Sequence, residues 1–323
     1  MGKTEVLVVD PRADWYESTL NARFDRIRVS KARSFEEAAE EELGRAEVLV
    51  TLGVPLMGVH FTADVAARMP RLKWVQCLIS GYEHIKHALA GRDDVLVTSA
   101  AGIHGPQMSE IALLHMLMLS RGVRTMLRNQ DGNVWQRVPQ RILEGQVVGI
   151  VGMGAIGMHL ARICKALGMT VHGVSRTERE IEGVDRVFPR EELTAVASQV
   201  DYLVLVVPAE PKTTHLVNAS VLAAMKPTAY LINMARGSIV DEEALIAALE
   251  REEIGGAGLD VFAVEPLPAE SPLWALPNVT ITPRTGGLHD RYAEQTLAVL
   301  EPNLTYYLDG RTDQMINVVG GRP

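Results

Sequence analysis

The sequence of 323 residues predicts an α/β protein with doubly wound layers, in which helices cover both faces of a parallel sheet. Short runs rich in Val and Leu alternate with segments of helical periodicity along most of the chain. Continuous apolar runs are typical of parallel strands buried on both faces. Their alternation with helices favours the doubly wound arrangement. At roughly 150 residues per domain, the length predicts about two domains.

In the first third of the chain, four apolar runs predict strands at 5–10, 46–53, 73–80 and 95–99. Segments 34–42 and 62–69 between them have helical periodicity. The apolar segment 102–122 predicts one long buried helix. Pro106 suits a first helical position and Gly122 suits a C-terminal stop.

A second alternating series follows. Strands are expected at 147–151, 170–174, 201–207, 229–234, 256–262 and 279–283. Helices are expected at 155–168, 191–199, 219–225 and 241–253. The last helical segment, 287–310, is expected to be interrupted at Pro302, because proline removes a helical hydrogen bond.

Charge and cysteine usage exclude several classes of function. The net charge of −8 argues against nucleic acid as the main partner, since such domains are usually basic. Cys77 and Cys164 form neither a disulfide framework nor a zinc motif, and we expect buried thiols in a reducing compartment. No metal site is expected, because His84 and His87 lack a third ligand.

The N-terminal apolar run is too short for a signal peptide. The most apolar helical stretch, 111–120, is about half the length of a membrane span. We therefore expect a cytoplasmic protein without a membrane partner.

A glycine-rich turn carries the strongest local signal. Gly152, Gly154 and Gly157 have the spacing G-x-G-x-x-G between a predicted strand and a predicted helix, the context that dinucleotide binding requires. The first glycine allows the tight turn, the second lets a pyrophosphate approach, and the third lets helix and strand pack closely. Ala155 and Ile156 open the helix, whose N-terminus offers unpaired N–H groups to an anion.

The end of the next strand predicts which nucleotide is preferred. A fold that prefers NAD usually carries Asp or Glu about 20 residues further on. Here Ser175 follows Gly157 by 18 residues, and Arg176 and Thr177 come next. Hydroxyl and guanidinium groups can donate to a phosphate. The sequence therefore predicts NADP as the preferred cofactor, with NAD possible.

Several motifs in order resemble the D-isomer-specific 2-hydroxyacid dehydrogenase family. They are the glycine turn, INMARGSIVDEEALIAAL (232–249), GAGLDVFAVEPLP (256–268), NVTITPRTGG (278–287), CLISGYEHIK (77–86), VPAEPKTTHLVN (207–218) and the segment that begins GIHGPQ at 102. The resemblance covers nearly the whole chain. It implies a Rossmann nucleotide-binding domain, 103–287, inserted into a flavodoxin-like substrate domain made of 1–102 and 288–323. It also implies a cleft between the domains and a homodimer.

The resemblance implies a substrate site. Arg236 corresponds to the arginine that binds the substrate carboxylate, for which a planar guanidinium is suited. Ser80 and Gly81 lie on the loop whose backbone N–H groups contact the same carboxylate. The substrate pocket is expected from loops at 52–57 and 80–82 and from the neighbouring subunit. Trp135 resembles a tryptophan near the subunit junction, although core packing is the favoured interpretation.

The resemblance also implies contacts with the cofactor. Pro208, Thr213 and Ala235 correspond to residues that line the nucleotide site. Asp260 resembles the residue that contacts the nicotinamide carboxamide, and a structural cap is its alternative role.

One catalytic position departs from the family pattern. Glu265 corresponds to the acid that pairs with a catalytic histidine, but Arg284 occupies the position of that histidine in TPRTGG. Arginine stays protonated, so it cannot act as an ordinary general acid or base. It can pair with Glu265 and stabilise a developing alkoxide. His104 and His289 are the histidines considered as substitutes.

Three functions follow from this departure. The favoured one is reduction of a small 2-oxo acid such as glyoxylate or hydroxypyruvate, with Arg236, Glu265 and Arg284 as catalytic residues and water as the proton source. The second is hydride transfer without a proton relay, as in formate oxidation. The third is a redox-inactive nucleotide-sensing protein of the corepressor type.

Overall fold

The computed structural model describes residues 2–54, 59–177 and 179–321. The chain forms two compact units, Met1–Ile103 with His289–Pro323, here the split domain, and His104–Leu288, here the inserted domain. Residues 55–57 of the expected pocket loop lie outside the described residues. Among the helices that the structure describes, none combines the length and apolar composition needed to cross a membrane.

The split domain contains a six-stranded sheet in the order β13-β5-β4-β3-β1-β2. Its strands are β1 (Thr4–Val9), β2 (Ile27–Ala32), β3 (Val48–Thr51), β4 (Trp74–Cys77), β5 (Leu96–Thr98) and β13 (Val318–Gly320). All pairs are parallel except β13 with β5. The first five strands have the flavodoxin-like order, in which the chain reverses direction across the sheet between β1 and β3.

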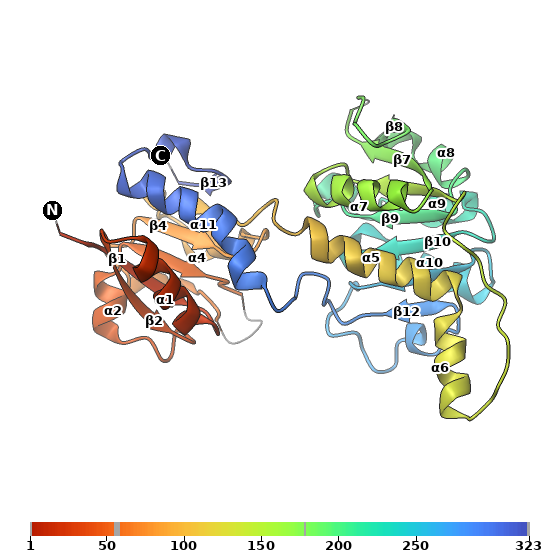
Figure 1. Ribbon diagram of the computed structural model, residues 1–323, viewed down its shortest axis with the longest axis horizontal. Coiled ribbons are helices and arrows are strands. Elements are labelled where there is room, and N and C mark those ends of the chain that lie inside the picture. The colour runs from red at the N-terminus through yellow and green to blue at the C-terminus, as the bar shows by residue number, and fades with distance from the viewer. Residues whose placement is uncertain (1, 55–58, 178, 322–323) are drawn as a thin grey trace. The chain divides into compact units, whose positions relative to one another are not determined.

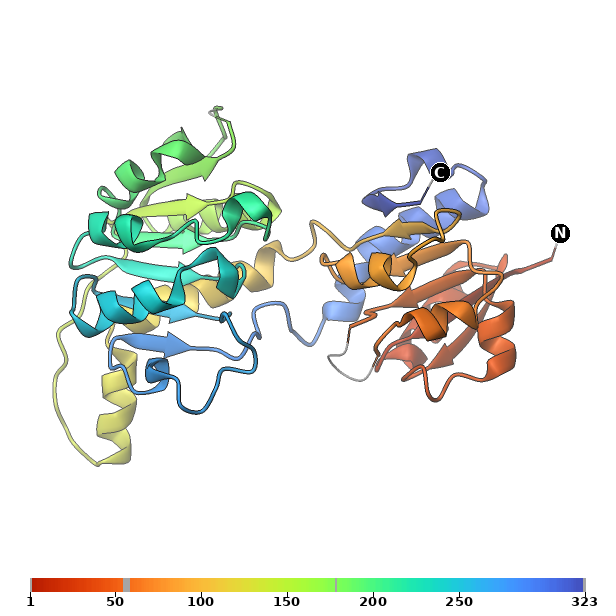
Figure 2. The ribbon, with the colours of Figure 1, turned by 180° about the vertical axis from the view of Figure 1, so that it is seen from behind.

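Helices cover both faces of this sheet. α1 (Ala13–Arg23) and α11 (Tyr292–Leu308) lie over one face, and α3 (Ala63–Ala67) and α4 (Glu83–Ala88) lie over the other (Figure 1 and Figure 2). α2 (Glu40–Arg45) precedes β3. The hydroxyls of Tyr16 and Thr296 share a buried hydrogen bond of 2.7 Å between α1 and α11. Asn303 of α11 donates to the side-chain oxygen of Gln76 on β4, at 3.2 Å. The C-terminal helix is therefore part of the core formed by the first hundred residues.

The inserted domain contains a seven-stranded parallel sheet in the order β12-β11-β10-β9-β6-β7-β8. Its strands are β6 (Val147–Val151), β7 (Thr170–Ser175), β8 (Arg186–Pro189), β9 (Tyr202–Leu205), β10 (Tyr230–Asn233), β11 (Gly256–Leu259) and β12 (Val279–Ile281). The order reverses between β6 and β9. In such sheets ligands bind at the carboxyl ends of the strands beside this reversal.

Two layers of helices enclose the second sheet. α5 (Gly105–Ser120) and α7 (Ala155–Ala166) cover one face, and α8 (Leu193–Ala197), α9 (Ala219–Ala224) and α10 (Glu242–Glu250) cover the other (Figure 1 and Figure 2). α6 (Val123–Asp131) follows Gly122 and contains no buried residue. Short 3-10 helices are η2 (Arg190–Glu192), η3 (Pro211–Thr213), η4 (Gly237–Ile239), η5 (Pro272–Trp274) and η6 (Thr312–Gln314). The predicted doubly wound fold is confirmed in both domains.

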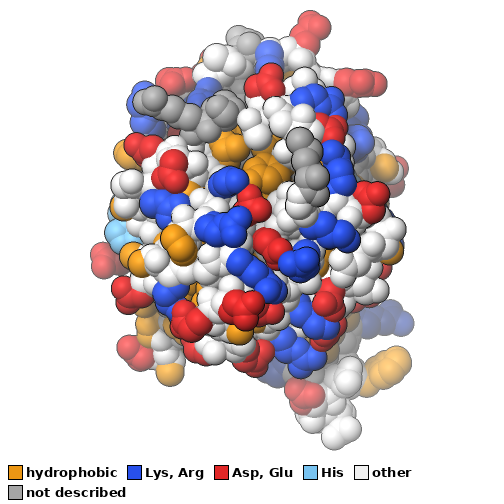
Figure 3. All heavy atoms as spheres, turned by 90° about the vertical axis from the view of Figure 1, so that its left-hand side faces the viewer, with side chains coloured by type: hydrophobic (Ala, Val, Ile, Leu, Met, Phe, Trp, Pro, Cys, Tyr) orange, Lys and Arg blue, Asp and Glu red, His pale blue; other side chains and the backbone are white. Residues whose placement is uncertain are grey.

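Charges of both signs are mixed on the face of the split domain that Figure 3 shows. Ion pairs in this domain include Lys31 with Asp14 at 2.7 Å and Lys73 with Glu47 at 2.7 Å. Exposed pairs of this kind each stabilise a fold by less than about 1 kcal/mol. The fold therefore depends on its apolar layers.

The helix expected at 34–42 is wrong, because α2 begins only at Glu40. Residues 34–39 form turns, in which Phe35 is buried against Phe61 with ring centroids 5.7 Å apart. The spacing of Phe35, Ala38 and Leu43 resembles one face of a helix. All three are buried, but Phe35 and Ala38 lie in the turns and Leu43 lies in α2.

The expected interruption at Pro302 is also wrong, because α11 is continuous through it. Leu300, Asn303 and Leu304 around it are fully buried, and this packing outweighs the loss of one hydrogen bond. The sequence reading missed the elements with short or strongly polar stretches, namely α1, β2, α4, α6, β8 and β13.

Candidate active site

The glycine turn between β6 and α7 is tight because backbones touch. Gly152 has φ of +109°, and a Cβ there would lie 2.8 Å from the carbonyl oxygen of Val206. A Cβ on Gly157 would lie 1.9 Å from the carbonyl oxygen of Gly152. Any side chain at either position would separate the helix from the strand. These two glycines are therefore required by the fold itself.

Gly154 differs, because no heavy atom lies within 4 Å of a Cβ built on it. Its φ of −91° and ψ of −162° suit any residue. Gly154 is the N-cap of α7, and Ala155 and Ile156 are the first helical residues, whose N–H groups have no intrahelical partner. Open space, free donors and the helix dipole fit a bound pyrophosphate. The turn therefore fits a dinucleotide.

The residues after β7 form a polar turn. The hydroxyl of Ser175 donates to the carbonyl of Thr177 and accepts from the N–H of Thr177, the latter at 3.3 Å. Ser175 therefore shapes the turn, and Arg176 and Thr177 are exposed. Arg179 donates to the carbonyl of Met153 in the glycine turn, at 3.1 Å. Sequence reasoning missed this second arginine, although it stands only three residues after Arg176.

Thr213 is fully buried and closes the loop after β9. Its hydroxyl donates to the carbonyls of Pro208 and Glu210, at 2.9 and 3.0 Å, and accepts from the N–H of Glu210 at 2.8 Å. Pro208 is exposed at the start of this loop. Thr213 thus stabilises the loop through hydrogen bonds to its backbone.

Arg236 follows β10 in an extended conformation, with an exposed side chain. The buried side chain of Asn233 holds this turn. Its amide donates to the carbonyl of Arg236 and its oxygen accepts from the N–H of Ala235, both at 3.1 Å. A Cβ on Gly237 would lie 1.9 Å from the backbone of Phe262, so the turn packs directly on the segment after β11. Asn233 is a positioning residue that sequence reasoning missed.

Arg284 and Glu265 form an ion pair, a pairing that the sequence indicated as possible. The other oxygen of Glu265 accepts from the N–H of Phe262 at 3.2 Å. Arg284 has φ of +54°, a left-handed conformation that non-glycine residues rarely adopt. Its side chain is 53% exposed, so its charge can reach a ligand. Within this pair Arg284 keeps its positive charge, but it cannot give up a proton as an acid.

Asp260 holds the loop that carries Arg284. One carboxylate oxygen accepts from the hydroxyl of Thr282 at 2.5 Å and the N–H of Thr285 at 2.9 Å. The other accepts from the N–H of Gly286 at 3.0 Å. Asp260 is only 3% exposed. The structure therefore gives Asp260 the capping role that the sequence left as its alternative.

The two substitute histidines lie in different environments. His104 is the N-cap of α5, and a Cβ on Gly287 would lie 3.9 Å from its ring, so it borders the Thr282–Gly287 loop. His289 belongs to the split domain, where its ring bonds to Gln295 at 2.8 Å and stacks edge-on against Tyr292. Of the two, His104 is therefore the one that borders the loop carrying Arg284.

Ser80 and Gly81 follow β4 in the split domain. The carbonyl of Gly81 accepts from the thiol of Cys77 at 3.5 Å. Burial raises the pKa of Cys77 to about 12, so this thiol is not a nucleophile. The carbonyl of Leu52, after β3, accepts from His84 at 3.3 Å. The ends of β3 and β4 are therefore tied together.

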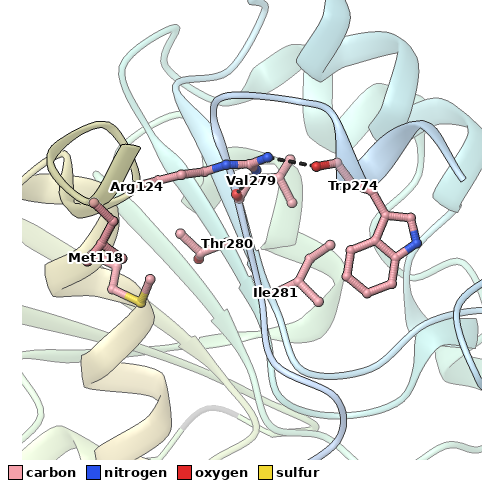
Figure 4. Close-up of a pocket in the computed structure, with 7 residues that line it drawn as sticks. Met118, Arg124, Trp274, Val279, Thr280 and Ile281 are labelled. Atoms are coloured by element: carbon pink, nitrogen blue, oxygen red, sulfur yellow. Dashed lines mark hydrogen bonds between the residues drawn. The ribbon is translucent and has the colours of Figure 1, made fainter. Parts of the chain in front are cut away.

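A groove of about 200 Å³ lies elsewhere on the inserted domain (Figure 4). It is lined by Met118, Arg124, Leu127, Trp274, Val279, Thr280 and Ile281. Arg124 donates to the carbonyls of Trp274 and Val279, at 2.7 and 2.6 Å. None of the predicted site residues lines this groove. In the described part of the chain, no group of three or more His, Cys, Asp and Glu could hold a metal ion.

Residues 113–286 match the family described as D-isomer specific 2-hydroxyacid dehydrogenase, NAD binding domain. A solved D-isomer specific 2-hydroxyacid dehydrogenase family protein from Aeromonas salmonicida subsp. salmonicida A449 is 32% identical, with a TM-score of 0.85 and 99% of each chain covered. A D-isomer specific 2-hydroxyacid dehydrogenase from Xanthobacter autotrophicus Py2, in complex with NADPH and MES, is 31% identical, with a TM-score of 0.79 and 98% of each chain covered.

An NADPH-dependent glyoxylate/hydroxypyruvate reductase from Sinorhizobium meliloti, in complex with NADP and sulfate, is 28% identical, with a TM-score of 0.80 and 98% of each chain covered. Each of these three solved structures matches both domains of the chain. The likeness therefore extends well beyond the nucleotide-binding turn.

Proposed function

Since the chain belongs to the D-isomer-specific 2-hydroxyacid dehydrogenase family of NAD(P)-dependent oxidoreductases, we propose that it reduces a small 2-oxo acid such as glyoxylate or hydroxypyruvate, with NADPH as the preferred cofactor. The observation that carries this proposal is the pair of exposed arginines, Arg236 and Arg284, that follow β10 and β12 of the nucleotide-binding sheet. Two cations suit a substrate that carries a carboxylate and develops an alkoxide.

The nucleotide is held by the glycine turn. Gly154, Ala155 and Ile156 direct backbone donors to the pyrophosphate, and Ala235 and Pro208 line the site. When bound, the nicotinamide supplies the hydride. The turn after β7 has Arg176 and Arg179 where an NAD-preferring fold usually has a carboxylate, so it suits a ribose 2′-phosphate. Titration of cofactor fluorescence is expected to give at least tenfold tighter binding of NADPH than NADH. Equal or tighter NADH binding would overturn the preference.

The substrate is held by its carboxylate. Arg236 binds it through its planar guanidinium, and the backbone of Ser80 and Gly81 supplies further donors. Arg284, fixed by Glu265, stabilises the negative charge that develops on the carbonyl oxygen. Because arginine keeps its proton, water delivers the proton to that oxygen.

The decisive test is a panel of 2-oxo acids with NADPH and NADH, on the wild type and on Arg284→His. Wild-type turnover of glyoxylate or hydroxypyruvate supports the proposal, and Arg284→Ala should then lower kcat about 100-fold. An inert wild type together with an active Arg284→His would show that Arg284 has no catalytic role. Formate-dependent reduction of NADP would favour hydride transfer without a proton. Tight NADPH binding with no turnover would favour a nucleotide sensor.

The partner that fits the inserted domain is a second copy of this chain. Figure 1 shows α6 and the segment after it reaching beyond the sheet. Trp135 in this segment is fully exposed, which shows that its expected core packing is wrong. Leu127 and Ile142 are 50% and 59% exposed, and Trp274 lines the apolar groove. Exposed apolar side chains on a projecting segment and a mainly apolar groove on the same chain suit a two-fold homodimer.

Light scattering should therefore give twice the monomer mass. Leu127→Asp should produce monomers, whereas Leu167→Asp, a comparably exposed leucine after α7, should leave the dimer intact. A wild type that is monomeric at micromolar concentration would exclude this assembly.

A further inference from the structure

A chain of buried polar side chains runs beneath the loop that carries Arg284. His115 of α5 is fully buried, and its Nδ1 lies 2.7 Å from the hydroxyl of Thr280 on β12. Its Nε2 lies 3.0 Å from the hydroxyl of Thr282, which is 2.5 Å from the carboxylate of Asp260. Asp260 extends this series of hydrogen bonds to the N–H groups of Thr285 and Gly286, the two residues that follow Arg284 in the loop.

The direction of these hydrogen bonds follows from chemistry. The carboxylate of Asp260 only accepts, so the single proton of the Thr282 hydroxyl points to it. The oxygen of Thr282 therefore accepts from His115, and His115 carries its proton on Nε2. Nδ1 then accepts from Thr280. Burial lowers the pKa of His115 to about 4, which keeps the ring neutral and preserves this order at neutral pH.

The imidazole of His115 packs directly against β11. A Cβ on Gly258 of β11 would lie 2.6 Å from the Cβ of His115, so α5 packs on the strand at closest approach. His115 thus fixes Thr282 relative to β11, the strand that Asp260 directly follows. The loop that carries Arg284 is therefore anchored to α5.

We propose that His115 is a positioning residue for Arg284: by donating to Thr282, it directs the Thr282 hydroxyl to Asp260 and keeps the Thr282–Gly287 loop in the shape that places the guanidinium. The role in turnover rests on the proposed function. The placement of the guanidinium does not, and it can be measured separately.

Two substitutions distinguish the hydrogen bond made by Nε2 of His115 from the one made by Nδ1. In His115→Gln the amide nitrogen can take the place of Nε2 and still reach Thr282. In His115→Asn the shorter amide reaches only the side facing Thr280. The expected result is a kcat about tenfold lower in His115→Asn, with the KM for NADPH unchanged, and recovery of most of this loss in His115→Gln. Equal loss in both variants would overturn the proposal.

A double-mutant cycle tests whether His115 acts through Arg284. In an Arg284→Ala background, His115→Asn should have no further effect on kcat. A second tenfold loss there would show a general structural role and overturn the proposal. Thr282→Val, which removes the link without opening α5, should reproduce the His115→Asn loss, so the test survives poor folding of either histidine variant.

An NMR measurement that needs no enzyme turnover tests this inference independently of the proposed function. The ¹⁵N–¹H signal of the Arg284 side chain, identified by its loss in Arg284→Ala, should shift in His115→Asn and Thr282→Val and stay in place in His115→Gln. This result would support the positioning role even if no 2-oxo acid were reduced. An unshifted signal in both His115→Asn and Thr282→Val would refute it, whatever the activity.

Discussion

The glycine turn after β6 and the Thr282–Gly287 loop after β12 follow strands of one parallel sheet, but they are held by opposite means. The turn is shaped by the absence of side chains, since backbones at Gly152 and Gly157 touch their neighbours. The loop is shaped by side chains, since Asp260 accepts hydrogen bonds from Thr282, Thr285 and Gly286.

This difference teaches which feature tolerates change. A turn made by close backbone contact cannot accept even one added carbon, whereas a loop held by hydrogen bonds can keep its course when one residue changes. The loop can therefore carry Arg284, at the position where the resemblance implies a histidine, and present its charged group beside Glu265.

The largest expected effect is that of Gly157→Ala. The added Cβ would lie 1.9 Å from the oxygen of Gly152, so helix and strand must separate. Unfolding in urea should show a loss of about 3 kcal/mol in stability. Gly154→Ala is the matched control, because its Cβ meets no protein atom. Equal stability of the two variants would contradict backbone contact as the feature that holds the turn.

The second largest effect is expected from acid, which should lower the stability contributed by the buried His115. The pKa of His115 is lowered to about 4 from 6.5 by burial, so between these values the unfolded chain binds a proton that the folded chain does not. Stability is therefore lost as the pH falls, by about 2 kcal/mol for this residue between pH 7 and pH 5. Urea unfolding at both pH values should show a smaller loss in His115→Gln. The same loss in both proteins would mean that His115 is not the titrating group.

Gly154→Ala should have a specific effect on the cofactor. The fold has room for the methyl group, so the melting temperature should stay the same. The methyl group would meet the pyrophosphate, and the Kd for NADPH should rise about tenfold. Fluorescence titration measures this change. An unaltered Kd would show that the pyrophosphate lies elsewhere.

The smallest effect is expected from Glu265→Gln. The Arg284–Glu265 pair is partly exposed, so its loss should change stability by less than about 1 kcal/mol. The arginine would lose its fixed position, and kcat should fall by roughly fivefold. Glu270→Gln, an exposed acid of the same segment, is the control. If both variants retain full activity, Glu265 does not set the position of Arg284.

The sequence predicted the elements whose signal is local and strong. Buried Val and Leu runs such as 147–151 formed the expected parallel strands, and the comparisons confirm the family. Short polar elements such as β2 and α6 were missed, since β2 mixes buried and exposed residues without strict alternation and α6 buries none. The position of Trp135 could not be predicted from the sequence, because a large apolar side chain can lie in the core of one chain or on its surface at a contact with another protein.

By itself, the sequence determined the doubly wound class and the glycine turn, and it offered Glu265 as a possible partner of Arg284, because periodicity, glycine spacing and motif order lie within short stretches. Only the tertiary structure decided that Asp260 caps the loop and that His115 joins it through Thr282, 167 residues away. Such hydrogen bonds arise where packing brings distant strands and helices together. Their partners carry no mark in the local sequence.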